Sequence, residues 1–310
     1  MGRSPVTGES TRTVTPALPV DLRLTLFGLR RGRLDPSVRF ELGGMWRATR
    51  TPEGPVTTHI RVSSAGGTVT MRAWGPGAGW ALDAFPRLVG ADDTEDGFDP
   101  GHGTVGELHR RLRGMRIGRS AAVVEALVAS ILEQKVVGIE ARRSYARLVR
   151  GLGEPAPGPG AETLVVPPAP GLLAATPSWT FHRAGVERKR ADTICRACSY
   201  ASRLEETVDM APADAMRRLT ALPGIGPWTA AEVALVALGD PDAVSVGDYH
   251  LPNMVAWTLA GEPRADDSRM LELLEPWRGH RGRVIRLIVM GAGAAPRWGP
   301  RMPLRTITGQ

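Results

Sequence analysis

The sequence predicts an α+β protein: a small N-terminal antiparallel β-sheet domain with one helix, followed by a mainly α-helical domain. Apolar and polar residues alternate in three short segments between residues 20 and 74, as they do in half-buried strands. From residue 105 onward, apolar residues recur instead at helical spacing. A third observation is a Gly-rich turn inside residues 222–230, between two of the expected helices.

The N-terminal part divides into a tail and a domain. Residues 1–18 are rich in Thr, Ser, Pro and Gly, and we expect them to be disordered. Residues 19–104 should form the α+β domain and its linker, the linker being the acidic, Gly-rich residues 91–104. A helix over residues 80–89 would cover one face of the sheet. The expected strands span residues 20–26, 58–62 and 68–74, the last two joined by an Ala-Gly-Gly hairpin at residues 65–67.

Residues 105–310 are expected to form one helical domain. Ser120 is a candidate N-cap for a helix that runs to Glu133, and a second helix should span residues 139–152. Residues 155–170 are rich in Pro and Gly, which predicts a long surface loop. Further helices are expected near residues 188–204, 211–222, 227–238, 249–259, 267–275 and 280–290.

Residues 222–230 read Leu-Pro-Gly-Ile-Gly-Pro-Trp-Thr-Ala and join two of these helices. Gly224 and Gly226 permit backbone angles that are closed to other residues, and Pro227 suits the first position of a helix. Such a turn would present its amides to an anion such as a DNA phosphate. An ordinary tight turn between packed helices is the alternative. Asp248 lies 22 positions after Gly226, in the sequence Gly-Asp-Tyr-His, and it favours the DNA interpretation.

The hairpin sequence and Asp248 together resemble the signature of the helix–hairpin–helix DNA glycosylase superfamily. The chain is most similar to its 3-methyladenine DNA glycosylase II branch, over roughly residues 105–290. Three further segments resemble that branch, at residues 131–137, 185–194 and 276–281. The resemblance implies base excision repair, in which alkylated purines are flipped out of double-stranded DNA and their N-glycosidic bonds hydrolysed.

Asp248 is the candidate catalytic residue. Cleavage of the bond between sugar and base passes through a transition state with oxocarbenium character, which a nearby carboxylate stabilises. The same carboxylate can orient or deprotonate the attacking water. The alternative is a helix N-cap, a role that Asp248 can fill in addition. Asp240 and Asp242 lie in a Gly-Asp-Pro-Asp sequence that is typical of a turn.

The lysines predict a monofunctional enzyme. Bifunctional members of the superfamily carry a Lys near the start of the second hairpin helix, where it forms a Schiff base. Trp228 occupies that position here, and Lys135 and Lys189, the only lysines, lie elsewhere. We therefore expect base release without lyase activity.

No cofactor is expected. The chain has two cysteines, Cys195 and Cys198, too few for a four-cysteine iron–sulfur cluster or a disulfide framework. They lie in an expected helix, although a redox-active Cys-x-x-Cys is the alternative. No metal ligand set is identified; the resemblance implies that the hairpin can hold a monovalent cation, Na⁺ or K⁺.

The candidate substrate pocket contains aromatic side chains. Trp228, Tyr249 and Trp277 could attract a cationic alkylated purine by cation–π interaction, although each could equally belong to the core. Glu232 lies one helical turn after Trp228, where the family often has an aromatic residue. It could read a base edge, attract a cationic base, or face solvent.

The candidate DNA-binding residues lie in three places. The hairpin contributes Leu222, Gly224, Ile225, Gly226 and Thr229. By resemblance, Gln134 and Lys135 form the loop that probes the minor groove, and Arg278 belongs to the late Pro-Trp-Arg motif. Further basic residues considered for the backbone-binding face are Arg110, Arg111, Arg113, Arg116, Arg281, Arg283 and Arg286.

Composition agrees with a nucleic-acid partner. The chain of 310 residues has a net charge of +7 and a pI of about 10.3, which favours an anionic partner. It lacks a signal-peptide pattern and a membrane-spanning segment, so we expect a cytoplasmic protein. We also expect it to be a monomer. Two alternatives stay open: a glycosylase for deaminated or oxidised bases, favoured if Glu232 is a hydrogen-bonding group in the pocket, and a non-catalytic helix–hairpin–helix DNA-binding protein.

Overall fold

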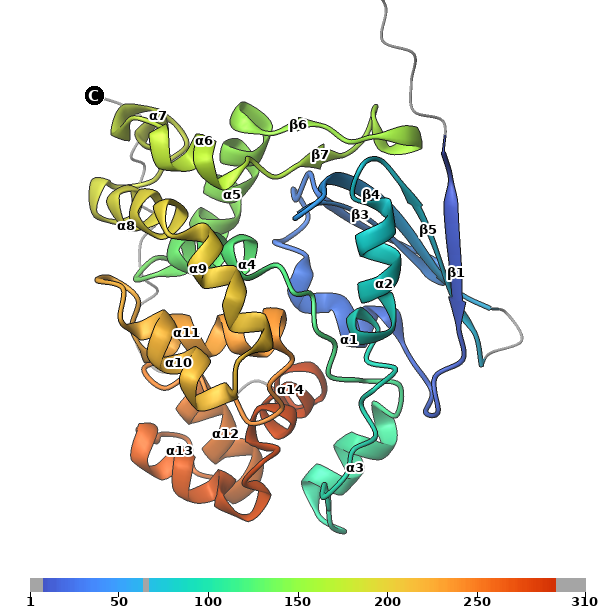
Figure 1. Cartoon of the computed structure of the whole chain (residues 1–310). Helices are drawn as coiled ribbons and strands as arrows, with labels where there is room; N and C mark the ends of the chain where they lie inside the picture. Colours follow the sequence, from blue (N-terminus) through green and yellow to red (C-terminus); the bar gives the residue numbers. More distant parts are fainter. Residues whose placement is uncertain (1–7, 64–66, 294–310) are drawn as a thin grey trace, which may run out of the picture.

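The computed structural model describes residues 8–63 and 67–293. It confirms the α+β class: a five-stranded antiparallel sheet lies on one side of the molecule, and helices make up the other (Figure 1). The strand order is β1-β5-β4-β3-β2. The strands are β1 Ser10–Val14, β2 Val38–Glu41, β3 Gly44–Thr51, β4 Gly54–Val62 and β5 Val69–Trp74.

Helix α2 (Ala78–Leu88) covers the inner face of this sheet, as the sequence predicted. Phe85 of this helix packs on Met45, Ile60 and Met71, which point inward from three neighbouring strands. Strands β4 and β5 pair in an antiparallel register, Val62 opposite Val69, as expected for the predicted hairpin. Most of its turn, residues 64–66, lies outside the described residues.

Two expectations about the first 26 residues are wrong. The expected disordered tail contains β1, which pairs with β5 (Ser10 opposite Ala73) and so covers an edge that would otherwise be unpaired. Residues 1–7 lie outside the described residues. The expected strand at residues 20–26 is instead α1 (Leu22–Leu26), followed by the 3₁₀ helix η1 (Phe27–Leu29). Asp21 caps α1, because its carboxylate accepts hydrogen bonds from the amides of Arg23 and Leu24.

Residues 155–170 are not a surface loop. They contain β7 (Val165–Val166), which pairs with β6 (Glu154–Pro155), and the 3₁₀ helix η2 (Gly158–Gly160). Ala156, Leu164 and Val166 are buried against Ala48 and Trp46 on the outer face of β3. Strand β3 is therefore covered on both faces, and it lacks the alternating pattern by which β4 and β5 were predicted. Strand β2 was not predicted either.

The helices surround two apolar clusters. The larger is built from α4 Val123–Glu133, α5 Gly138–Leu152, α6 Pro170–Ala175, α7 Ser178–Arg183, α8 Arg188–Ser199, α9 Ala201–Glu205, α10 Pro212–Thr220 and α11 Pro227–Val233. The smaller contains α3 Thr104–Arg111, α12 Leu251–Ala260, α13 Asp267–Leu274 and α14 Arg281–Gly291. Short 3₁₀ helices follow α9 and α13, at η3 (Glu206–Asp209) and η5 (Glu275–Trp277).

The start of α4 differs from the prediction, and the end of the helical segment that begins with α11 agrees with it. Ser120 does not cap α4, which begins three residues later; the carboxylate of Glu205 accepts from the amides of Val123 and Val124 instead. Helix α11 continues as a π-helical segment, η4 (Ala234–Leu238), and ends at Gly239 with φ of +68°. None of the helices in the described part of the chain is long and apolar enough to cross a membrane.

Candidate active site and DNA interface

The hairpin, residues 221–226, joins α10 to α11. Gly224 has φ of +96°, and a Cβ there would lie 2.7 Å from Oγ1 of Thr193 on α8. This position therefore requires glycine, as the sequence predicted. Gly226 has φ of −95° and is extended, so the expectation of a glycine-only backbone is wrong at this residue. A Cβ at Gly226 would have no described atom within 4 Å, which leaves this side of the hairpin open.

The hairpin is held from behind by two side chains. Gln134 Nε2 donates to the carbonyl of Gly224 over 3.0 Å and to Oγ1 of Thr229 over 2.9 Å. Arg196 Nη1 donates to the carbonyl of Pro223 over 2.8 Å. Gln134 and Thr229, both expected at the DNA interface, thus brace the hairpin through these groups.

The predicted DNA-binding residues around the hairpin differ in exposure. Ile225 is buried in the larger helical cluster, and Leu222 is partly buried against it. Gly224 is exposed at the surface of the turn. Lys135, next in sequence to Gln134, is also exposed and has a left-handed φ of +55°. The exposed residues of the turn and of the start of α11 are Ala221, Pro223, Gly224 and Pro227, and Lys135 is adjacent in sequence to the bracing Gln134.

Asp248 is fixed by three N–H donors. Its Oδ2 accepts from the indole Nε1 of Trp228 over 3.1 Å. Its Oδ1 accepts from the amides of His250 and Leu251 over 2.7 and 2.8 Å, at the start of α12. The carboxylate thus also caps a helix, the role that the sequence left open beside catalysis. It remains partly exposed, so it is oriented by the protein without being closed off from solvent.

Glu232 lies on the same face of α11 as Trp228, and its contacts lead to the same loop. Ser245 Oγ donates to Glu232 Oε1 over 2.5 Å, so residues 245–248 are joined to α11 at two consecutive helical turns. Burial raises the pKa of Glu232. The hydrogen bond from Ser245 opposes this shift, the charge of Glu133 adds to it, the charge of Arg31 opposes it, and that of Asp248 adds to it.

Ser245 was not identified from the sequence, and neither was Asp267, whose carboxylate accepts from the amide of Gly247 over 3.0 Å. Both side chains hold the segment that contains Asp248. A serine and an aspartate in loops and helix starts carry no distinctive local signal. Of the two, only Ser245 lies close in sequence to the Gly-Asp-Tyr-His segment, and that position is the one signal that could have identified it.

The side chains of the other two aromatic pocket candidates have different partners from that of Trp228. Tyr249 is 84% exposed, and its ring contacts His250 edge to face. Trp277 donates from Nε1 to the carbonyl of Asp99 over 3.0 Å and packs against the smaller helical cluster. Among the contacts of the described residues, none joins Trp277 to Asp248. Of the three aromatic candidates, Trp228 therefore has the direct contact with the carboxylate.

Several arginines considered for the DNA-binding face are buried. Arg116, Arg283 and Arg286 have almost no exposed surface, so we correct their assignment to a backbone-binding face. Arg283 pairs with Asp93 and Glu95. Arg278 is exposed, and its guanidinium forms two 2.7 Å hydrogen bonds with Glu275 on the preceding turn. That pair must open before Arg278 can bind a phosphate through these atoms.

The cysteines favour the structural interpretation over a redox role. Cys195 and Cys198 both lie on α8 and are free. Burial raises the pKa of both thiols, that of Cys198 to about 12. A thiol with a raised pKa is a poor nucleophile at neutral pH, because the thiolate is the reactive form.

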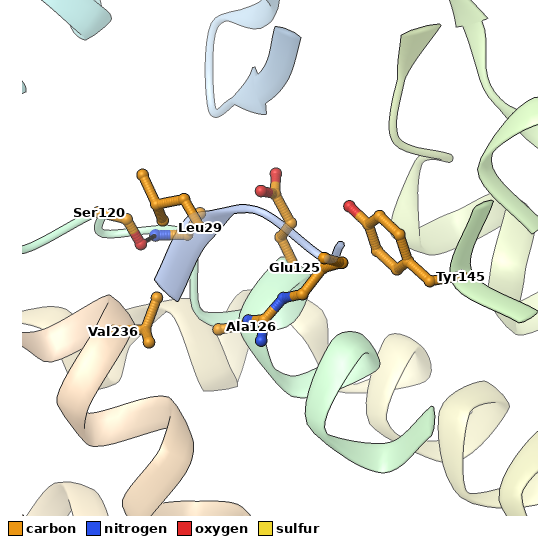
Figure 2. A pocket seen from close by; sticks show the side chains of 8 residues that line it. Leu29, Ser120, Glu125, Ala126, Tyr145 and Val236 are labelled. Atoms are coloured by element: carbon orange, nitrogen blue, oxygen red, sulfur yellow. Dashed lines mark hydrogen bonds between the residues drawn. The ribbon is translucent and has the colours of Figure 1, made fainter. Parts of the chain in front are cut away.

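A small cavity lies between the N-terminal domain and the helices (Figure 2). It is lined by Leu29, Arg31, Ser120, Ala122, Glu125, Ala126, Tyr145 and Val236. Its volume is about 10 Å³, space for about one water molecule. A purine cannot enter it, and Asp248 does not line it. It is therefore not the base-binding site.

The hairpin carbonyls fit a monovalent cation only in part. Those of Pro223 and Gly224 already accept hydrogen bonds from Arg196 and Gln134. The guanidinium at Pro223 also places a positive charge beside that carbonyl, which disfavours a cation there. A cation would therefore have to use the remaining carbonyls of the turn, and we assign it no part in the reaction.

Comparison with known proteins agrees with this arrangement. No family model matches the chain. It is 30% identical over 183 residues to DNA-3-methyladenine glycosylase 2 of Escherichia coli (strain K12), covering 58% of this chain and 62% of that protein. It is 35% identical over 142 residues to the probable bifunctional transcriptional activator/DNA repair enzyme AlkA of Mycobacterium tuberculosis (strain CDC 1551 / Oshkosh), covering 44% of this chain and 28% of that protein. The chain thus matches less than two thirds of either relative.

The fold also matches a solved structure. A 3-methyladenine DNA glycosylase from Archaeoglobus fulgidus superimposes with a TM-score of 0.78 over 90% of this chain and 97% of that one, at 19% sequence identity. Because the match covers the sheet as well as the helices, the N-terminal domain and the helical part are arranged as in that protein. At this level of identity, the match establishes the fold.

Proposed function

We propose that this chain is a DNA glycosylase of the helix–hairpin–helix superfamily that releases alkylated purines of the 3-methyladenine type, as its similarity to DNA-3-methyladenine glycosylase 2 of Escherichia coli supports. The observation that carries this proposal is the Asp248 carboxylate. It follows a hairpin suited to a phosphate, and its three N–H donors hold it in one orientation while leaving it partly exposed. A protein that only bound DNA would have no use for a negative charge at this place, since a phosphate would repel it.

In the proposed reaction, Asp248 acts on the sugar of the flipped nucleotide. As the bond between C1′ and the base nitrogen breaks, the bonding electrons leave with the base and positive charge develops on the sugar. The carboxylate stabilises that charge. A water molecule then adds to C1′ and loses a proton, for which Asp248 is the nearby acceptor. The products are the free base and an abasic site.

The hairpin is proposed to bind a phosphate beside the lesion. Gly226 leaves the approach to the turn open, and the first amides of α11 follow directly. The bonds from Gln134 and Arg196 support this role, because they fix the turn and reduce the cost of ordering it when DNA binds.

We propose that the enzyme is monofunctional. The indole of Trp228 is the side chain in contact with Asp248, and an indole cannot form an imine with a sugar aldehyde. Both lysines, Lys135 and Lys189, are exposed and lie on α4's C-terminal loop and on α8. We further propose that it acts as a cytoplasmic monomer on chromosomal DNA, since one chain carries both the hairpin and the carboxylate.

One observation favours the alternative of a deaminated or oxidised base. Glu232 is a hydrogen-bonding group next to the loop that carries Asp248, at a position where an aromatic side chain was expected from the family resemblance. The two candidates separate in one assay, in which DNA that carries alkylated, deaminated or oxidised bases is incubated with the protein and the freed bases are identified.

The sharpest test of the proposed function uses Asp248→Asn. We expect release of alkylated purines to fall by at least about a hundredfold under single-turnover conditions, with binding to abasic-site analogue DNA retained. Asp83→Asn, which removes the same charge from an exposed side chain of α2, is the control and should behave as wild type. Wild-type rates in folded Asp248→Asn would refute the assignment. If neither wild type nor control releases any base, the function itself is wrong.

A further inference from the structure

We propose that Glu232 determines which base this enzyme releases, by accepting a hydrogen bond from the exocyclic amino group of a flipped adenine-type base. Arg286 is the buried positive charge that serves Glu232 as a positioning residue. The inference rests on the proposed glycosylase function and adds a substrate class to it: cationic alkylated purines with an amino group, in preference to those with a carbonyl, at the six-position.

The geometry begins with two residues on one face of α11. Trp228 and Glu232 are four positions apart, and each is hydrogen-bonded to the loop that ends in the catalytic carboxylate: Trp228 to Asp248, and Glu232 to Ser245. Ser245 occupies Oε1 of Glu232. Oε2 has no hydrogen-bond partner among the described residues. It is also not among the polar atoms that are both fully buried and unpaired. This oxygen is a free acceptor on a side chain that is hydrogen-bonded to the loop that carries Asp248.

Arg286 on α14 and Val236 on η4, the continuation of α11, both lie next to Gly28. Arg286 is 4% exposed, and its Nε and Nη1 are buried without a hydrogen-bond partner in the described part of the chain. A Cβ added to Gly28 would lie 3.3 Å from both Arg286 Nη2 and Val236, which is one turn after Glu232. A buried guanidinium without hydrogen bonds is costly, so a compensating charge is needed.

The negative charges of Glu232 and Asp93 act on Arg286. Burial lowers the pKa of Arg286 to about 10, and the negative charge of Glu232 is the largest influence that opposes this shift. Charged groups that act on Glu232 are Arg31 after η1, Glu133 at the end of α4 and Asp248 before α12, and Glu232 in turn acts on Arg286 of α14. The two carboxylates favour protonation of Glu232, and the two arginines favour its charged form.

A charged Glu232 discriminates by chemistry that an aromatic side chain does not offer. An aromatic face attracts any cationic purine, whatever its edge carries. A carboxylate attracts the cation as well, but it can only accept hydrogen bonds. An amino group at the six-position of the purine satisfies it, whereas a carbonyl oxygen there leaves two acceptors facing each other. Among cationic alkylated purines, adenine-type lesions should therefore be favoured over guanine-type lesions.

Methylated DNA tests this directly, because it contains both 3-methyladenine and 7-methylguanine. Both bases carry a positive charge, and they differ at the six-position, amino in one and carbonyl in the other. The measurement is the ratio of their single-turnover release rates. In Glu232→Gln, the amide keeps the shape and can donate to a carbonyl, so the ratio should fall about tenfold or more relative to wild type.

The positioning role of Arg286 is tested by the pH profile of the same ratio. Protonation of Glu232 should abolish the preference as the pH falls. Arg286→Gln removes a charge that favours ionised Glu232, so the loss should begin at a higher pH than in wild type. Ser245→Ala should shift the profile in the same direction, since its hydrogen bond also favours the charged form, and it provides the test if Arg286→Gln does not fold.

The outcomes separate this inference from the proposed function. If wild type releases neither base, the proposed function fails. If it releases both, and the ratio is unchanged in a Glu232→Gln variant with a wild-type circular dichroism spectrum, Glu232 does not select the base and this inference is overturned. A profile that does not move in folded Arg286→Gln or Ser245→Ala would overturn the positioning role.

Discussion

The indole Nε1 of Trp228 donates a hydrogen bond to Oδ2 of Asp248 across 3.1 Å. This contact joins the first turn of the second hairpin helix to the carboxylate that starts α12. The part of the protein proposed to hold the DNA backbone and the part proposed to act on the sugar are thereby coupled through one side chain. By the family resemblance, Trp228 also occupies the position where bifunctional members of the superfamily carry a lysine.

Removal of that hydrogen bond should slow the reaction. Trp228→Phe keeps an aromatic ring but loses the Nε1 donor, so Asp248 keeps only its two backbone donors. A hydrogen bond to a charged group contributes about 1.5–3 kcal/mol, and we expect single-turnover base release to fall about tenfold or more. Trp277→Phe, which removes the donor to Asp99, is the matched control. Equal rates in both variants would show that the indole does not orient the carboxylate.

The two hairpin glycines should respond differently to alanine. Gly226→Ala adds a methyl group into open space, so the melting temperature should stay near that of wild type while affinity for abasic-site analogue DNA falls, whatever the sequence. Gly224→Ala forces a side chain into a backbone with φ of +96° and against Thr193, which should cost about 1–3 kcal/mol of stability. Unchanged DNA affinity of Gly226→Ala at matched salt would argue against a phosphate at this turn.

The protein should not cut the DNA strand. With water as the nucleophile, product DNA should stay full length until alkali or an abasic endonuclease is added. Borohydride, which traps imines between protein and DNA, should give no efficient adduct. An adduct that forms efficiently and disappears in Lys135→Ala or Lys189→Ala would show that one of these amines reaches the sugar. Weak trapping that survives both substitutions would reflect slow reaction of the α-amine.

Substitution of the buried Arg283 should reverse the way in which the contribution of Asp93 to stability depends on pH. Burial alone would raise the pKa of Asp93, but hydrogen bonds and the charge of Arg283 hold it below its usual range. In wild type this stabilisation is present above about pH 4, the pKa of an unfolded aspartate, and is lost as the pH falls. Arg283→Met should cost about 3–5 kcal/mol at pH 7, because Asp93 and Glu95 lose a buried partner.

Without Arg283, burial should dominate and raise the pKa of Asp93. Protonation then relieves the buried charge, so the stability difference between variant and wild type should shrink as the pH falls from 7 toward about 4.5. Urea unfolding at the two pH values measures it. Arg281→Met, on the same helix and paired with the more exposed Asp242, is the control and should cost less. Equal losses in the two variants, at both pH values, would contradict the role of burial.

The hairpin and its neighbourhood were largely readable from the sequence, because their determinants are local. Gly224 supplies a positive φ, Pro227 begins a helix, and Asp248 stands just before the next helix, where its carboxylate meets backbone amides two and three residues later. The wrong detail, the backbone of Gly226, also has a local cause: a Gly-x-Gly pattern does not say which glycine has the unusual angle.

Tertiary structure alone decided which charged side chains face one another. Arg278 and Arg286 lie in the same basic segment of the sequence, yet one is exposed and paired with Glu275, and the other is sealed beside Gly28. The strand at Ser10–Val14 exists because β5, more than fifty residues away, offers it an edge. Such outcomes depend on contacts between residues far apart in the chain, and burial then sets the electrostatic strength of a group such as Glu232. A local sequence pattern predicts neither the contacts between distant residues nor the burial of a side chain.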